Sequence, residues 1–155
     1  MMDFLLWCQS TALSRWILSA KWRYPTVEIL HIAGLVLVFG SVLVLNLRIF
    51  GRVLKTQPVS EVAAGLSPIM MVGVAAQFVS GPVLFMATAK HFYESVPFRV
   101  KMLLLAVALV YHFGVHRSLA MNPETPARVL TKSAVSSMLL WCALVVAGLS
   151  IELGG

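Results

Sequence analysis

Four long stretches of the chain contain no Asp, Glu, Lys or Arg: residues 29–47, 62–89, 102–116 and 133–151. A helix needs about 20 apolar residues to cross a hydrocarbon core of ~30 Å, and three of the stretches provide them unaided. Residues 102–116 reach that length when Arg99, Lys101 and Arg117 extend toward the headgroups. The pattern therefore predicts an all-α integral membrane protein, a four-helix transmembrane bundle.

The predicted chain has two parts. Residues 26–155 form the transmembrane domain, with spans at about 26–50, 62–89, 98–117 and 131–153. In residues 1–25, polar and apolar positions alternate with the period of a helix. One helical face carries Asp3, Ser10, Ser14 and Lys21. This pattern predicts an interfacial amphipathic helix that Pro25 ends. Four spans place both ends of the chain on one side of the membrane.

The composition agrees with this picture and limits the partners. Hydrophobic residues make up 59% of the chain and charged residues 12%, which is outside the soluble globular range. The net charge of +6 comes from Lys and Arg beside the spans, which indicates headgroup contacts rather than nucleic acid. The predicted partners are the lipid bilayer and a membrane-complex or electron-transfer protein. Cys8 and Cys142 have no metal-type spacing, and no disulfide is expected.

Ionisable residues inside or beside spans are costly and indicate function. Glu28 and His31 are three apart at the start of span one, and His91 and Glu94 repeat the spacing at the end of span two. Antiparallel spans bring both pairs to one end, where Glu152 also falls. Facing helices of bundles build metal sites from Glu and His. A metal site, a hydrogen-bonded structural cluster, a haem edge and a proton path all remain open here.

At the other end, His112 and His116 are four apart on span three and point the same way. One helix offers two imidazoles to a metal at this spacing. Three methionines fall near the same depth: Met70, Met71 and Met138. Thioether and imidazole together favour copper over zinc. The alternative is that the methionines fill the core and the histidines form ordinary hydrogen bonds.

Haem b is the second cofactor that intramembrane histidines suggest, with His31 and His91 as its ligands. The two lie roughly 10 Å apart in depth at the rise of an α-helix, which tilt would have to absorb. No enzyme motif is present, so a catalytic role is not favoured. The leading hypothesis is a non-catalytic bundle that binds haem b or copper, with haem b slightly ahead. The alternative is a structural or accessory subunit without a cofactor.

Residues 27–51, VEILHIAGLVLVFGSVLVLNLRIFG, and 98–117, FRVKMLLLAVALVYHFGVHR, resemble an uncharacterised bacterial family of four-helix inner-membrane domains. That family is loosely similar to copper-resistance D-type membrane domains and small b-type cytochromes. The matching positions are Glu28, His31, Gly34, Arg48, Lys101, His116 and Arg117. The resemblance implies a multi-pass protein of the bacterial inner (cytoplasmic) membrane. His91 and His112 lie outside the matching pattern.

Overall fold

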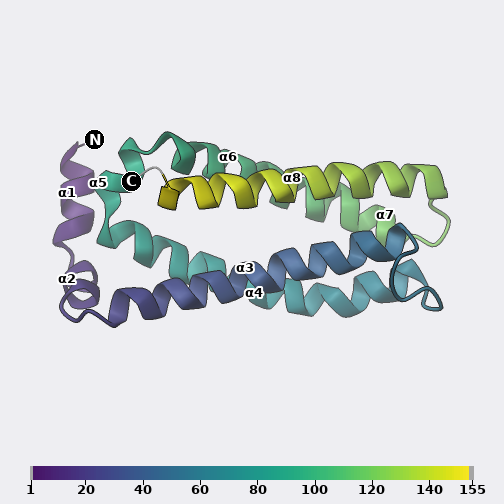
Figure 1. Ribbon diagram of the computed structural model, residues 1–155, viewed down its shortest axis with the longest axis horizontal. Helices are drawn as coiled ribbons and strands as arrows, with labels where there is room; N and C mark the ends of the chain where they lie inside the picture. The colour runs from purple at the N-terminus through teal and green to yellow at the C-terminus, as the bar shows by residue number, and fades with distance from the viewer. Residues whose placement is uncertain (1, 154–155) are drawn as a thin grey trace.

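A computed structural model describes residues 2–153, and all of the regular structure in this range is helical. The elements in chain order are α1 (Met2–Ser10), α2 (Ala12–Leu18), α3 (Arg23–Ile49), α4 (Val59–Ala87), α5 (Ala89–Glu94), α6 (Val96–Tyr111), the π-helix η1 (His112–His116), α7 (Arg117–Met121) and α8 (Ala127–Leu153). Four of the helices thus formed are long and apolar enough to cross a membrane: α3, α4, the continuous run α6–η1–α7, and α8. They lie side by side along the long axis (Figure 1). The prediction of an all-α transmembrane bundle is confirmed.

The observed helices begin a few residues before the predicted spans, and α3 and α4 end one or two residues before the predicted ends. The first begins at Arg23, ahead of Pro25, rather than after it. Proline is accepted there because N–H groups in the first turn have no acceptor within the helix. Pro68 and Pro82 lie inside α4. The interruption of the helix that was predicted at Pro25 lies at residues 19–22 instead.

The bundle consists of two antiparallel pairs, α3 with α4 and α6 with α8, as Figure 1 shows. Glycines permit the close approach of α3 and α4. A Cβ built on Gly73 would lie 2.8 Å from the carbonyl oxygen of Gly34, and one built on Gly34 would lie 3.0 Å from the Ala76 Cβ. Backbones pack this closely in membranes where small residues face each other. Gly34, Val38 and Ser41 lie on one stripe of α3 at helical spacing, and all three are buried in the bundle.

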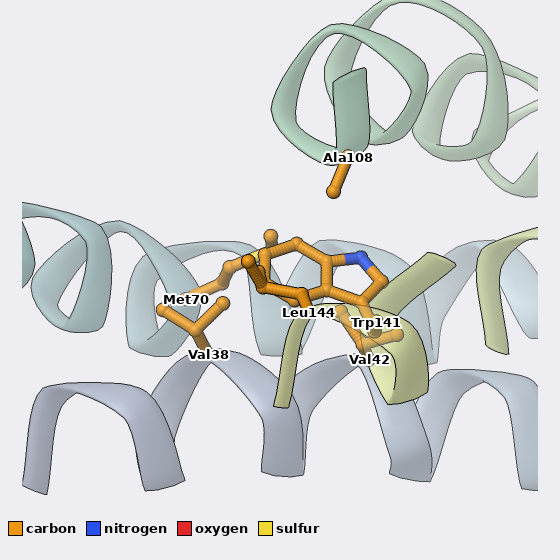
Figure 2. Packing of buried hydrophobic residues seen from close by; sticks show 6 residues of the cluster. All are labelled: Val38, Val42, Met70, Ala108, Trp141 and Leu144. Carbon is orange, nitrogen blue, oxygen red and sulfur yellow. The ribbon is translucent and has the colours of Figure 1, made fainter. Parts of the chain in front are cut away.

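The two pairs are joined around Trp141 of α8, which is only 1% exposed. Figure 2 shows its indole between Ala108 of α6 on one side and Val42 of α3 on the other. Leu144 and Met70 complete this layer of the core. Within residues 2–153 the backbone of α6 does not come close to that of α3 or α4. The pair α6–α8 therefore contacts the pair α3–α4 mainly through α8.

The N-terminal segment forms two short helices, α1 and α2, rather than one continuous helix. Thr11 separates them, because its side chain caps α2 by accepting from the Ser14 N–H at 3.2 Å. Both lie across one end of the bundle (Figure 1). Leu5 and Cys8 pack against Ala89, and the Ser14 hydroxyl donates to the carbonyl of Met86 at 3.2 Å. Cys8 is buried and Cys142 is exposed, and neither forms a disulfide within the described residues.

Candidate functional site

The helix that carries His112 and His116 changes its winding at these two residues. The Arg117 N–H donates to the carbonyl of His112, five residues earlier, which makes residues 112–116 a π-helical turn. Such turns are rare and are frequent at functional sites. Four residues make nearly one full turn of this wider helix, so both imidazoles leave it on the same side. Their ring centroids lie 5.6 Å apart, and the residues are 4% and 0% exposed.

His116 is held in place from α8. Its Nδ1 lies 2.8 Å from the Ser133 hydroxyl, and the Tyr111 hydroxyl donates to the same oxygen at 3.3 Å. The Tyr111 ring also stacks on the imidazole, with a centroid separation of 6.5 Å. Sequence reasoning missed Ser133 and Tyr111. The available signal was a polar pair four residues apart, Ser133 and Ser137, at the start of an apolar span.

Three buried polar atoms near this turn have no hydrogen-bond partner among the described residues: His112 Nδ1, His116 Nε2 and Asn46 Oδ1. Asn46 is fully buried on α3 and reaches α8 through its amide nitrogen, which donates to the Ser137 hydroxyl at 3.5 Å. Unpaired buried polar atoms are costly and rare in native structures. Each histidine thus keeps one ring nitrogen available to a ligand, with His116 held through its other nitrogen, as metal-binding histidines are.

A cavity of about 10 Å³ adjoins this turn. This volume holds one water molecule or one ion and no organic group. Its lining residues come from α3, α4 and the turn: Ser41, Leu45, Ala63, Leu66, Ser67, Met70, His112 and Arg117. Met70 is the methionine of the predicted three that lines the cavity, whereas Met71 is exposed. Arg117 is positioned by its Nε, which donates to the Ser67 hydroxyl at 3.0 Å.

His31 lies near the other end of the bundle and is part of the α3–α4 contact. Its Nδ1 is 2.8 Å from the Ser80 hydroxyl, and that hydroxyl donates to the Ala76 carbonyl at 2.6 Å. Since the single hydroxyl proton is thereby used, the Ser80 oxygen accepts from Nδ1–H of His31, and Nε2 is the basic nitrogen. The Gln77 amide donates to the His31 carbonyl at 2.5 Å. A polar side chain inside a membrane needs such a partner on a neighbouring helix, and the His31 carbonyl on α3 provides it.

Lys101 approaches this region from α6. Its Nζ lies 3.7 Å from the position a Cβ on Gly148 would occupy, so the small residue on α8 makes room for the lysine chain. Ala108, His112 and His116, further along the same run of helix, are all buried.

His31 and His91, the predicted haem ligands, occupy different places. His31 is level with Gly81, where a Cβ would lie 3.6 Å from its Cε1. His91 lies ten residues after Gly81, in α5, beyond the break at Thr88 where α4 ends. It is exposed and lines a separate cavity of about 330 Å³ together with Glu94, Ser150 and Ile151.

The structure therefore brings together His112 with His116, and His91 with Glu94. Glu28 is half-buried on α3, one turn before His31, and does not line the His91 cavity. The side chain of Glu152 lies outside the described part of the chain. Within residues 2–153 no three or more His, Cys, Asp or Glu residues form a group that would hold a metal. The carboxylate-type cluster at this end stays a prediction.

Comparison with protein families identifies a family that matches most of the chain. Residues 23–154 match DUF6644, a family of unknown function, and they cover the whole transmembrane bundle. The chain belongs to this family. No curated protein and no solved structure matches this DUF6644 chain significantly. The match confirms the predicted uncharacterised family, while similarity to copper-resistance D-type domains or b-type cytochromes stays a prediction.

Proposed function

We propose that this DUF6644 protein is a multi-pass protein of the bacterial inner membrane that binds copper as Cu(I) at His112 and His116. The observation that carries the proposal is the pair of buried imidazoles, each with one ring nitrogen that has no partner among the described residues. A metal at about 2.0 Å from a ring nitrogen is about 3.1 Å from the ring centroid, so two imidazoles on one ion have centroids at most about 6.2 Å apart. The observed 5.6 Å lies within this limit.

The surroundings favour a soft monovalent ion. Met70 lines the same cavity as His112 and can supply a thioether, which selects Cu(I) over zinc. Arg117 lines that cavity too, and its positive charge repels a metal cation. Because the repulsion scales with the charge of the ion, it is half as large for Cu(I) as for a divalent ion. Two neutral imidazoles and a thioether add no further charge.

Haem b at His31 and His91 stays a prediction, and the placement of these residues gives it no additional support. His31 uses Nδ1 for Ser80, and His91 is exposed about ten residues beyond the level of His31. The cavity beside His112 is far smaller than a porphyrin. Copper therefore replaces haem as the leading proposal.

Copper titration of the purified protein tests the proposal. Wild type should withdraw one Cu(I) per chain from a chromogenic Cu(I) chelator under anaerobic conditions. His116→Ala and His112→Ala should lose this binding, because one imidazole leaves a soft ion under-coordinated. His91→Ala and Glu28→Gln are the matched controls at the other end of the bundle and should bind as wild type does. Equal binding by wild type and His116→Ala would eliminate the site.

A structural role is the second candidate, and the hydrogen bond between His116 and Ser133 favours it. In that case His116 only ties η1 to α8. Wild type then binds no Cu(I), and His116→Ala lowers the free energy of unfolding by about 1 kcal/mol, the ordinary value of one hydrogen bond. The same variant, measured by titration and by melting, distinguishes the two functions.

A further inference from the structure

The surface of α1 and α2 that faces away from the bundle is strongly apolar. Each helix is anchored by buried residues, Leu5 and Cys8 on α1 and Ile17 on α2. The remaining large apolar side chains of this segment are exposed: Met2, Phe4, Leu6, Trp7, Leu13, Trp16, Leu18 and Trp22. These two helices lie across the end of the spans rather than alongside them, so their exposed face is at the level where a bilayer meets water (Figure 1).

Tryptophan is enriched at this level because its ring is apolar and its N–H is polar. Three of the four tryptophans of the chain, Trp7, Trp16 and Trp22, are on this surface and are each more than half exposed. Helices with such a face lie in the plane of the interface. The occupant of the α1–α2 surface is therefore lipid.

The charges on the segment indicate which lipid. Residues 2–23 carry three basic side chains, Arg15, Lys21 and Arg23, and a single acidic one, Asp3. Arg15 and Lys21 are exposed, while Arg23 is half-buried at the corner between α2 and α3. Basic residues beside a membrane surface attract anionic headgroups.

Arg23 is fixed in a defined position at this corner. Its guanidinium carbon lies 4.4 Å from the Trp16 ring centroid and 5.5 Å from that of Trp22. One terminal nitrogen donates to the Trp16 carbonyl at 2.8 Å and to the Ser19 hydroxyl at 2.6 Å. Its Nε is buried without a partner among the described residues. A guanidinium held this way between two interfacial aromatic rings presents a fixed positive charge to a phosphate.

We propose that the α1–α2 surface, with Arg15, Lys21 and Arg23, binds the headgroups of anionic phospholipids in preference to zwitterionic ones. This proposal is independent of copper binding, since the two sites are at opposite ends of the bundle and share no residue.

Tryptophan quenching by brominated lipids tests it in the full-length protein. Vesicles of phosphatidylcholine with phosphatidylglycerol are prepared twice at equal mole fractions, with the bromine on one lipid or on the other. The signal comes from Trp7, Trp16 and Trp22, because Trp141 is 1% exposed in the core. Brominated phosphatidylglycerol should quench wild type at least about twofold more than brominated phosphatidylcholine.

The charge-removal variant is Arg15→Gln/Lys21→Gln/Arg23→Gln, for which the quenching ratio should fall to one. A matched variant removes three exposed basic residues at the opposite end, Arg52, Lys55 and Arg128, and should keep the wild-type ratio. Arg15→Gln/Lys21→Gln changes only exposed side chains and should give an intermediate ratio even if loss of Arg23 disturbs folding. Equal quenching of wild type by both lipids, or no quenching by either, overturns the proposal.

Discussion

Gly73 of α4 offers the sharpest test of how the bundle is packed. A Cβ at this position would lie 2.8 Å from the Gly34 carbonyl oxygen, 2.8 Å from the Val38 Cγ2 and 2.9 Å from the Leu37 Cβ. Two of these three atoms are a backbone oxygen and a Cβ, which move only with α3 itself. Gly73→Ala should therefore push α3 and α4 apart. Overpacking a tight contact lowers the free energy of unfolding by about 1–3 kcal/mol, and we take about 2 kcal/mol as the expected packing cost.

Alanine also favours a helix over glycine by up to ~1 kcal/mol, and this gain partly hides the packing cost. Gly65→Ala corrects for it, because Gly65 is in the same helix and a Cβ there has open space around it. The difference between the two variants isolates the packing cost.

The free energy of unfolding is measured by SDS titration in mixed micelles, with Trp141 in the core as one reporter. Gly73→Ala should be about 2 kcal/mol less stable than Gly65→Ala. Equal stability of the two variants would refute the close contact between α3 and α4.

Two further predictions follow from the arrangement of the spans and the histidines. Reporter fusions after Lys55 should lie on one side of the membrane and fusions after Glu94 and at Gly155 on the other; a Gly155 fusion on the Lys55 side would rule out four crossings. The purified protein reduced with dithionite should show no α-band of b-type haem. A sharp band that disappears in His31→Ala would instead establish the haem prediction and displace copper as the leading cofactor.

The transmembrane helices could be predicted from the sequence because bilayer thickness and hydrophobicity alone determine them. The stretches without charge became α3, α4, α6–η1–α7 and α8. Their ends were less predictable, as the start of α3 at Arg23 shows. Proline is accepted both at the position before a helix and in the first turn of the helix, and the sequence does not distinguish these two positions.

The candidate site was predictable only in part. The spacing of His112 and His116 indicated a shared face, and both side chains are buried together. Asn46 and Ser133 were missed as neighbours of the histidines. Whether they come close to the histidines depends on the relative depth of α3, α8 and η1 in the bundle, which the sequence pattern of one helix does not determine. The different depths of His31 and His91, by contrast, were already expected from their positions in spans one and two, and the structure places His91 in α5, beyond the break at Thr88.

The π-turn at His112–His116 also sets the rotation of everything that follows it in the same helix. The five residues after it form α7, which packs on α4 and places Arg117 against Ser67. Deleting one residue, such as exposed Gly114, would restore α-helical winding and leave the orientation of α7 nearly unchanged, because the π-turn holds one residue more than an α-helical turn. Arg117 and Ala120 would then stay on α4. The π-turn is thus the place where the helix absorbs one extra residue: a family member one residue shorter between His112 and Asn122 would keep the same end of the bundle without the turn.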